Sequence, residues 1–356
     1  MKDQNIFLAK TTNPTPLKSL LSTNAATEKV QPLTITFEGD QKVLLDQNNP
    51  QAISWAKKID YLQKNNRPVY IETDDNNTIT KLCTPEAALI WKIETEDERI
   101  VHVYLHTNCV VYTLNRDHSN FETMLNDLHA AMDKGSQVLV TATHREYEIT
   151  DVRPMLFLFG NEEPEEEEEP EPDVPAKTVT PERAEELFKM MQTKTCTAGA
   201  AKGTDCVPFN YPGSGCWVRA HLMGFFLREQ KETPAKIWCD GRPYLWAFTK
   251  NDPNCRVGWG WHVAVTLVVE DKNGKKTLTV FDPSLSDKPL PAKDWQDLQN
   301  DVNSVTRESK WQQYHHFSGT ASKKTANIDM EEHRVNLDNL CREQGAPPPY
   351  DCSGKF

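Results

Sequence analysis

The chain has 356 residues, of which 38% are hydrophobic, and a formal net charge of −12. This length allows two or three domains, each with its own core. No window approaches the roughly 18–20 consecutive apolar residues of a membrane span, and the first residues lack the apolar core of a secretory signal. The basic residues form no patch of the kind that binds nucleic acid. We therefore expect neither a membrane nor a nucleic acid as a partner.

The acidic residues are concentrated in one stretch, NEEPEEEEEPEPD, at 161–173. This stretch holds nine of the 52 acidic residues and no basic residue, and without it the chain is nearly neutral. A segment of Glu and Pro repels itself and has no apolar side chain to bury. The composition predicts an acidic linker at 161–180 that separates an N-terminal from a C-terminal region.

The N-terminal region shows the same pattern twice after a tail at 1–29. A strand signal, a helical spacing and a second strand signal follow one another, and an offset of 69 residues maps Leu45 onto Leu114. The pattern predicts two small α/β modules, at 30–95 and 96–160, that form an internal repeat. Neither module combines His, Cys and acid in a catalytic pattern, so we expect a binding, folding or inhibitory role. Whether Cys83 and Cys109 are free or paired stays open.

A glycine loop and a helix flank one cysteine in the run YPGSGCWVRAHLMGFFLREQ at 211–230. The apolar residues from Trp217 onward recur at helical spacing, which places Cys216 at a helix N-terminus. The unpaired N–H groups and the positive end of the macrodipole stabilise a thiolate there. For such a cysteine taken alone, a buried or disulfide-bonded thiol is the more common explanation.

A predicted hairpin supplies possible partners for this thiol. Two runs, 262–269 and 277–282, flank the turn signal Asp-Lys-Asn-Gly. This register brings Asp282 within side-chain reach of His262, although a slip of one residue would turn one of them to the other face. Together with Cys216 they form a nucleophile, a base and an orienting acid. The alternatives are a strand-edge histidine and a turn-capping aspartate.

Other histidines are weaker candidates for chemistry. His221 lies five residues after Cys216 and is rotated by roughly 140° around the helix, so we expect it to pack or pair elsewhere. His315 and His316 have no companions at the spacing of metal ligands. We therefore predict no metal and no cofactor.

The C-terminal region contains seven cysteines, an odd number that leaves at least one unpaired. Pairing neighbours in the sequence leaves Cys216 alone, although this is one of 15 pairings of the other six. The tryptophans near the candidate triad suggest an apolar slot for a substrate side chain, with core packing as the alternative. The predicted disulfides are Cys196–Cys206, Cys239–Cys255 and Cys341–Cys352, and the slot residues are Trp217, Trp259 and Trp261.

Five motifs of the C-terminal region resemble the bacterial protein-glutaminases, which deamidate glutamine side chains in proteins. They are LFKMMQTKTCTAG, DCVPFNYPGSGCWVRAHLM, CRVGWGWHVAVTLVV, VFDPSL and YDCSGKF, and the resemblance covers nearly all of 181–356. The family's catalytic residues fall on Cys216, His262 and Asp282. The resemblance implies an α+β fold with a transglutaminase-like, papain-like core in the catalytic domain 181–356.

Residues 31–90 resemble the pro-region of the same family, which lies over the catalytic cleft and is removed by proteolysis. This chain differs in its second module and its acidic linker, so the resemblance leaves open which module covers the site. It implies protein or peptide substrates with accessible glutamine, an activating protease and a monomer. The expected disulfides indicate a secreted or periplasmic protein whose signal is not part of this sequence.

The sequence therefore predicts a cysteine-dependent protein-glutamine deamidase that works through a γ-glutamyl thioester. Transglutaminase-type acyl transfer and peptide-bond cleavage are alternatives that use the same triad. A third alternative is a disulfide-stabilised binding module without activity. Ammonia release without cross-linking and without chain cleavage distinguishes these functions.

Overall fold

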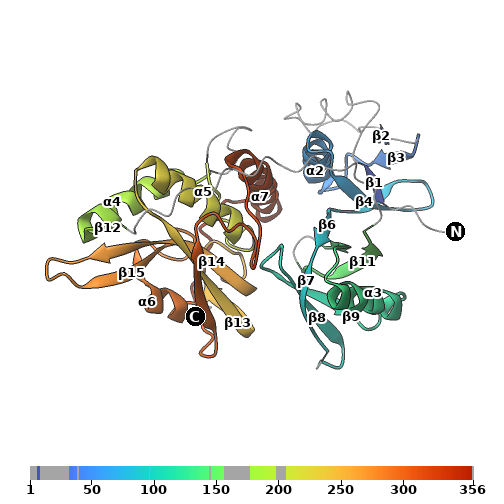
Figure 1. Cartoon of the computed structure of the whole chain (residues 1–356). Coiled ribbons are helices and arrows are strands. Elements are labelled where there is room, and N and C mark those ends of the chain that lie inside the picture. Colours follow the sequence, from blue (N-terminus) through green and yellow to red (C-terminus); the bar gives the residue numbers. More distant parts are fainter. Residues whose placement is uncertain are drawn as a thin grey trace. The chain divides into compact units, whose positions relative to one another are not determined.

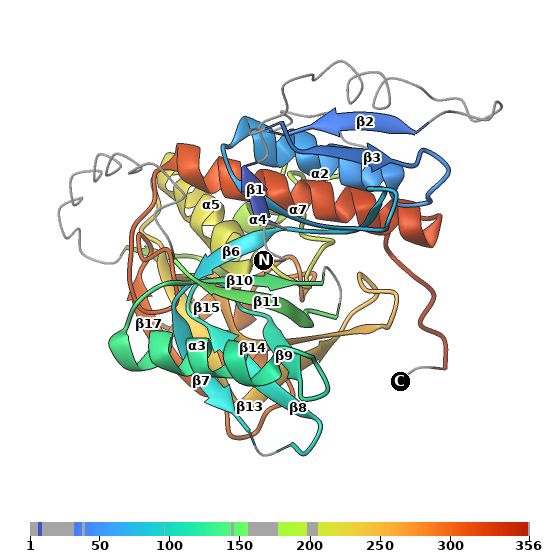
Figure 2. The same cartoon turned by 90° about the vertical axis from the view of Figure 1, so that its right-hand side faces the viewer.

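The structure of the protein is a computed structural model (Figures 1 and 2) that describes residues 6–8, 32–37, 40–95, 97–143, 146–155, 177–197 and 206–354. Most of the predicted tail and linker lies outside these residues. The described residues combine helices and sheets, in agreement with the predicted α+β class. They fall into two compact units. Unit 1 takes its residues from Met1–Ala88, Thr95–Val101 and Tyr112–Leu156, and unit 2 from Leu89–Glu94, His102–Val111 and Phe157–Phe356.

The described part of unit 1 contains two helices and several short antiparallel sheets. Its first part consists of β1 (Ile6–Leu8), β2 (Leu33–Thr36), β3 (Lys42–Leu45), α2 (Ala52–Lys64), β4 (Pro68–Thr73) and β5 (Ile79–Cys83). Its second part consists of β6 (Pro85–Ala88), β9 (Val111–Asn115), α3 (Phe121–Lys134), β10 (Val138–Ala142) and β11 (Ile149–Pro154). Helix α2 packs on β4. Helix α3 packs on β10 and β11 (Figure 2). The order strand, helix, strand, strand occurs in both parts, and the interpretation as an internal repeat stays a prediction.

Unit 2 is built on a sheet with the strand order β16-β15-β14-β13-β17, and β12 pairs with β14 in parallel. The strands are β12 (Thr178–Val179), β13 (Ala235–Phe248), β14 (Arg256–Glu270), β15 (Lys276–Phe281), β16 (Leu290–Pro291) and β17 (Val305–Lys310). The helices are α4 (Pro181–Gln192), α5 (Cys216–Glu229), α6 (Ala292–Asp297) and α7 (Lys323–Gln344). No helix in the described part of the chain has the length and apolar composition needed to cross a bilayer.

Helix α5 is the central helix of unit 2. Eleven of its side chains are buried, and it packs against both β14 and α7 (Figure 1). A helix that is enclosed in this way needs small or apolar residues on nearly all sides rather than on one stripe. Gly224 provides one close approach, because a Cβ there would lie 2.7 Å from the ring of Trp311. The sequence indicated one apolar face, and the structure shows that two neighbours cover this helix.

The predicted hairpin is present as β14 and β15. In the turn, Asp271 accepts hydrogen bonds from the backbone N–H groups of Asn273 and Lys275, and Gly274 has a φ of +76°. Turns of this kind need a residue that tolerates positive φ, which glycine does at no steric cost. The ladder pairs Val265 with Phe281, within one residue of the predicted register. It thereby places His262 and Asp282 near each other at the end of the sheet.

Two short segments from the predicted N-terminal modules group with unit 2. Strand β7 (Ile90–Glu94) pairs with the end of β8 (Ile100–Leu105), for example Ile93 with Val103. The chain then continues through His106 to Val111, and Cys109 is completely buried in the same core cluster as Trp261. The division into compact units thus differs from the predicted boundary at residue 180, because 89–94 and 102–111 belong with the C-terminal part.

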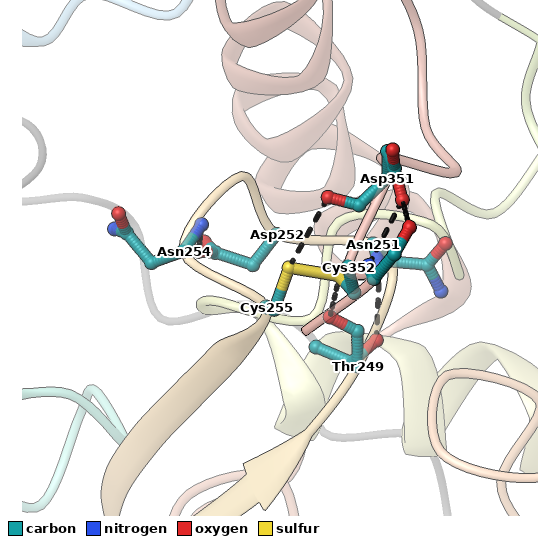
Figure 3. Close-up of a disulfide and its surroundings, with 8 residues drawn as sticks. Thr249, Asn251, Asp252, Asn254, Cys255, Asp351 and Cys352 are labelled. Carbon is teal, nitrogen blue, oxygen red and sulfur yellow. Dashed lines mark hydrogen bonds between the residues drawn. A yellow bond between two sulfur atoms is a disulfide. The ribbon is translucent and has the colours of Figure 1, made fainter. Parts of the chain in front are cut away.

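One of the three predicted disulfides is present and the other two are wrong. Cys196 is bonded to Cys206 as expected, but Cys255 is bonded to Cys352 (Figure 3). The C-terminal segment returns to the loop before β14, where the N–H of Tyr350 donates to the carbonyl of Lys250 at 2.7 Å. Cys239 lies in the middle of β13 and Cys341 near the end of α7, and both are free thiols. Pairing by distance in the sequence failed because tertiary contacts brought the chain end to Cys255.

We expect Cys352→Ser to destabilise unit 2 by up to about 4 kcal/mol, because this disulfide closes a loop of 97 residues. Urea denaturation under non-reducing conditions measures the loss. The matched control is Cys341→Ser, which removes a thiol outside any disulfide and should leave the midpoint nearly unchanged. An equal loss in both variants would instead support the sequence-based pair Cys341–Cys352.

Candidate active site

Cys216 is the first residue of α5, as predicted, and its side chain is 1% exposed. The preceding residue, Gly215, has a φ of +76° and is the N-cap of the helix. A Cβ at Gly215 would lie 2.6 Å from the ring of His333, so only glycine fits between the loop and α7. The glycine therefore lets the chain enter the helix with Cys216 at its N-terminal end, where the helix dipole favours a thiolate.

His262 and Asp282 are in direct contact. The Nε2 of His262 lies 2.8 Å from Oδ2 of Asp282, and both side chains are almost fully buried. Since a carboxylate only accepts, this bond places the proton of a neutral imidazole on Nε2 and leaves Nδ1 as the basic nitrogen. His262 Nδ1 is buried and has no hydrogen-bond partner within the described part of the chain.

Two indole rings hold the plane of the His262 ring. Trp259 stacks on it with ring centroids 4.5 Å apart, and Trp295 lies at 5.6 Å with an interplanar angle of 27°. Trp295 also donates its indole N–H to Oδ2 of Asp282 at 3.0 Å. The imidazole is thus fixed by a carboxylate at its edge and by rings at its faces. Trp295 was not predicted, because a tryptophan in the polar run AKDWQD carries no local signal for a contact with Asp282.

The pKa values of the carboxyl and the thiol respond to this environment in opposite directions. Burial alone would raise the pKa of Asp282, but His262, the N–H of Trp295 and the charge of Arg219 outweigh it and hold the pKa below its usual value. Burial and a hydrogen bond with the Cys109 thiol raise the pKa of Cys216 well above its usual value. The charge of Arg219 and the backbone N–H of Val263, the residue that follows His262, lower the pKa of Cys216 but do not outweigh burial.

Part of unit 2 is similar to a known protein family. Residues 184–299, a stretch that contains Cys216, His262 and Asp282, match a family model described as Glutaminase. These residues are similar to the glutaminase family. The predicted resemblance and the enzyme class, a protein-glutaminase type of enzyme, are thereby confirmed at the level of the family. A comparison with curated proteins found no match.

Two solved structures share the fold of a large part of the chain. A crystal structure of pro-protein-glutaminase matches with a TM-score of 0.57 and 20% identity, over 74% of this chain and 97% of that one. A crystal structure of the A47Q2 mutant of pro-protein-glutaminase matches with a TM-score of 0.57 and 19% identity, over 71% of this chain and 93% of that one. The similarity extends beyond the part that follows residue 177, so it includes some of the N-terminal region.

Arg219 is a buried cation one helical turn after Cys216, within the matched stretch 184–299. Its Nη1 donates to the carbonyls of Tyr211 at 3.0 Å and Ser214 at 2.5 Å, which ties the glycine loop to α5. Its charge lowers the pKa of both Cys216 and Asp282, and so favours their anionic forms. The sequence carried a signal that we did not use, since an arginine in the apolar run CWVRAHLM indicates a buried charge with a specific partner.

The three tryptophans of the predicted slot surround this centre but differ in role. Trp259 stacks on His262 and donates to the carbonyl of Pro212 at 3.0 Å. Trp217 and Trp261 pack edge to face with centroids 6.1 Å apart. Trp261 donates its indole N–H to the carbonyl of Leu105 at 2.9 Å. All three are buried in the described structure, so their role as a substrate slot stays a prediction.

The segment 102–111 contacts the residues beside Cys216. The backbone N–H of Gly260 donates to the carbonyl of Cys109 at 2.8 Å, and the hydroxyl of Ser214 donates to Oδ1 of Asn108 at 3.2 Å. Cys109 is 0% exposed, and its thiol lies close enough to that of Cys216 to raise the pKa of Cys216. The segment therefore lies beside the loop that precedes Cys216 and beside the strand that carries His262. Sequence reasoning had no signal for this contact, because the two cysteines are far apart in the chain.

The remaining histidines of interest lie in other contacts, as expected for His221. Its Nε2 donates to the carbonyl of Ala321 at 2.7 Å, and its Nδ1 lies 3.2 Å from Nζ of Lys236. Burial lowers the pKa of His221 to about 3, so it is neutral at physiological pH. His316 pairs with Asp240 at 2.5 Å and stacks on Trp261 at 4.8 Å. Both histidines therefore have polar partners of their own in the structure.

Proposed function

We propose that unit 2 is a cysteine-dependent protein-glutamine deamidase with Cys216 as nucleophile, His262 as acid and base, and Asp282 as orienting acid. The family match supports the general reaction class, and the His262–Asp282 contact at 2.8 Å is the observation that carries the assignment of roles. Acyl transfer through a thiol requires a nucleophile, here at a helix N-terminus, and a base with one free nitrogen. It also requires a carboxylate that binds the other nitrogen of the base.

The proposed reaction has two halves. The Cys216 thiolate attacks the side-chain amide carbon of glutamine, and His262 protonates the departing ammonia from Nδ1. A γ-glutamyl thioester results. His262 then removes a proton from water, which attacks the thioester and releases glutamate and the thiol. The N–H groups at the start of α5, including that of Cys216, are suited to stabilise the oxyanion in both halves.

The arrangement also supports a transglutaminase-like, papain-like core. Cys216 opens a helix, His262 lies within β14, and Asp282 directly follows β15. Helix α5 packs on β14, which brings the N-terminus of the helix to the strand that carries the histidine. The same triad also serves acyl transfer to amines and peptide hydrolysis, so the identity of the acceptor must come from experiment.

We further propose that the N-terminal region is an inhibitory pro-region. The segment 102–111 lies beside Cys216. Its backbone carbonyls accept hydrogen bonds from the N–H of Gly260 and the indole N–H of Trp261. Two of the structures with the same fold are described as pro-protein-glutaminase, which supports this role. A tethered segment has a high effective concentration at the site, and cutting the chain within 161–180 would remove that advantage. The two disulfides suit a secreted or periplasmic protein.

Ammonia release from a glutamine-containing protein tests this function. We expect the reduced full-length protein to release little ammonia, and a version cut at a protease site introduced within 161–176 to release far more. A lysine-containing acceptor protein in the same reaction provides the control. Covalent cross-links would favour a transglutaminase, new chain termini would favour a protease, and no reaction at all would favour the binding module.

A further inference from the structure

Two buried thiols from distant parts of the chain meet at the candidate active site. Cys109 comes from the segment that follows β8, and Cys216 is the first residue of α5. They are 0% and 1% exposed, neither is in a disulfide, and both belong to the same buried core cluster. The Cys109 thiol lies close enough to that of Cys216 to raise its pKa. Any small apolar residue would fill this space, whereas a second thiol can also react with the first.

The backbone around Cys109 is held against the strand that carries His262. Gly260 donates to the carbonyl of Cys109 at 2.8 Å, and Trp261 donates to the carbonyl of Leu105 at 2.9 Å. A Cβ at Gly260 would lie 2.6 Å from the ring of Tyr104, so the segment approaches as closely as a glycine allows. The contact between the thiols thus follows from a backbone position fixed at several points.

The other buried free thiols have different surroundings. Cys83, in unit 1, is buried near the charges of Lys81 and Glu72, and burial raises its pKa to about 11. Cys239 lies within β13, and burial raises its pKa to about 12. Cys109 therefore differs in having a thiol, and a proposed catalytic one, as its contact.

We propose that Cys109 and Cys216 are a redox pair, and that an oxidising low-molecular-weight disulfide converts them into a disulfide bond that blocks the active site. The bond itself requires only the contact, while its effect on activity rests on the proposed function of Cys216. Cys109 would then be the resolving thiol of Cys216. A cut within 161–176 would not suffice for activation until this bond is reduced.

The chemistry proceeds by two exchanges. In a state in which the segment has moved away, the Cys216 thiolate attacks one sulfur of glutathione disulfide and releases one glutathione. When the segment returns, the Cys109 thiol attacks the Cys216 sulfur of the mixed disulfide, forms the Cys109–Cys216 bond and releases the second glutathione. Two protein thiols are oxidised and one glutathione disulfide is reduced to two glutathione thiols. Because the segment is part of the same chain, the second step is intramolecular and favoured.

Non-reducing peptide mapping of the full-length protein tests the proposal. Reduced protein is treated with glutathione disulfide at neutral pH, its remaining thiols are alkylated in denaturant, and the digest is analysed by mass spectrometry. We expect a peptide linked through Cys109 and Cys216, which disappears in Cys109→Ser and persists in the matched control Cys83→Ser. In Cys109→Ser, Cys216 should remain a free thiol or carry glutathione.

A second readout uses the cut within 161–176. After oxidation, the two fragments should migrate together on a non-reducing denaturing gel and separate when dithiothreitol is added, with recovery of ammonia release. Two results together would overturn the proposal. The oxidised, cut wild-type protein would run as separate fragments on the gel, and Cys109 and Cys216 would each be found alkylated in the peptide map. A missing reaction in the reduced, cut protein would contradict the proposed function and leave the disulfide result unaffected.

Discussion

Replacing Cys216 with serine is expected to lower ammonia release by at least about a thousandfold in the cut, reduced protein. A serine hydroxyl at this position is nearly isosteric but is not ionised by a neighbouring imidazole as a thiol is. The helix N-terminus and the contact with Val263 would still be present, so the loss would be chemical rather than structural. The turnover rate on one protein substrate is the measurement.

Cys341→Ser is the matched control for this variant, because it removes another free thiol of unit 2 that lies near the end of α7. It should retain wild-type turnover. A thermal unfolding curve for each variant separates loss of fold from loss of reaction. Substantial turnover by Cys216→Ser with an intact fold would show that another group is the nucleophile.

Asp282→Asn is expected to reduce kcat by about a thousandfold or more, with little change in KM. An asparagine accepts only through its carbonyl oxygen and carries no charge, so it neither stabilises the imidazolium nor secures the proton on Nε2. His262 would remain between Trp259 and Trp295, since ring stacking does not depend on the carboxylate. A fall in kcat without a change in KM would therefore show that Asp282 orients the base and does not bind the substrate.

Trp295→Phe provides the graded comparison at the same carboxylate. It keeps an aromatic ring beside His262 but removes the indole N–H that donates to Asp282 at 3.0 Å. The loss of one hydrogen bond to a charged group corresponds to about tenfold in rate if it acts fully in the transition state. Equal losses in the two variants, or no loss in Asp282→Asn, would contradict the proposed role of Asp282.

Local signals in the sequence predicted the elements that carry the candidate site. A glycine loop before an apolar helical run located Cys216, and a turn of Asp-Lys-Asn-Gly fixed the hairpin register that joins His262 and Asp282. Both depend on backbone preferences within a few residues, which are readable without a structure. The family motifs then pointed to the same three residues.

Contacts between distant segments were not predictable in this way. The pairing of Cys255 with Cys352 depends on where the C-terminal segment returns, and the contact between Cys109 and Cys216 depends on a segment that groups with unit 2. Trp295 reaches Asp282 from a short helix that carries no motif. Each of these contacts is set by the packing of whole elements, for which a single sequence contains no local signal.

Mass spectrometry of a protein substrate tests the central claim most directly. The cut, reduced protein is incubated with a glutamine-containing protein in water enriched in heavy oxygen, and the substrate is then digested and sequenced. We predict that specific glutamines become glutamates that carry one heavy oxygen atom, with ammonia released and the chain uncut, and that Cys216→Ser leaves them as glutamines. The account would be contradicted if the wild-type protein left the glutamines unchanged. It would also be contradicted if glutamines became joined to lysines, or if peptide bonds were cleaved, and no glutamates formed.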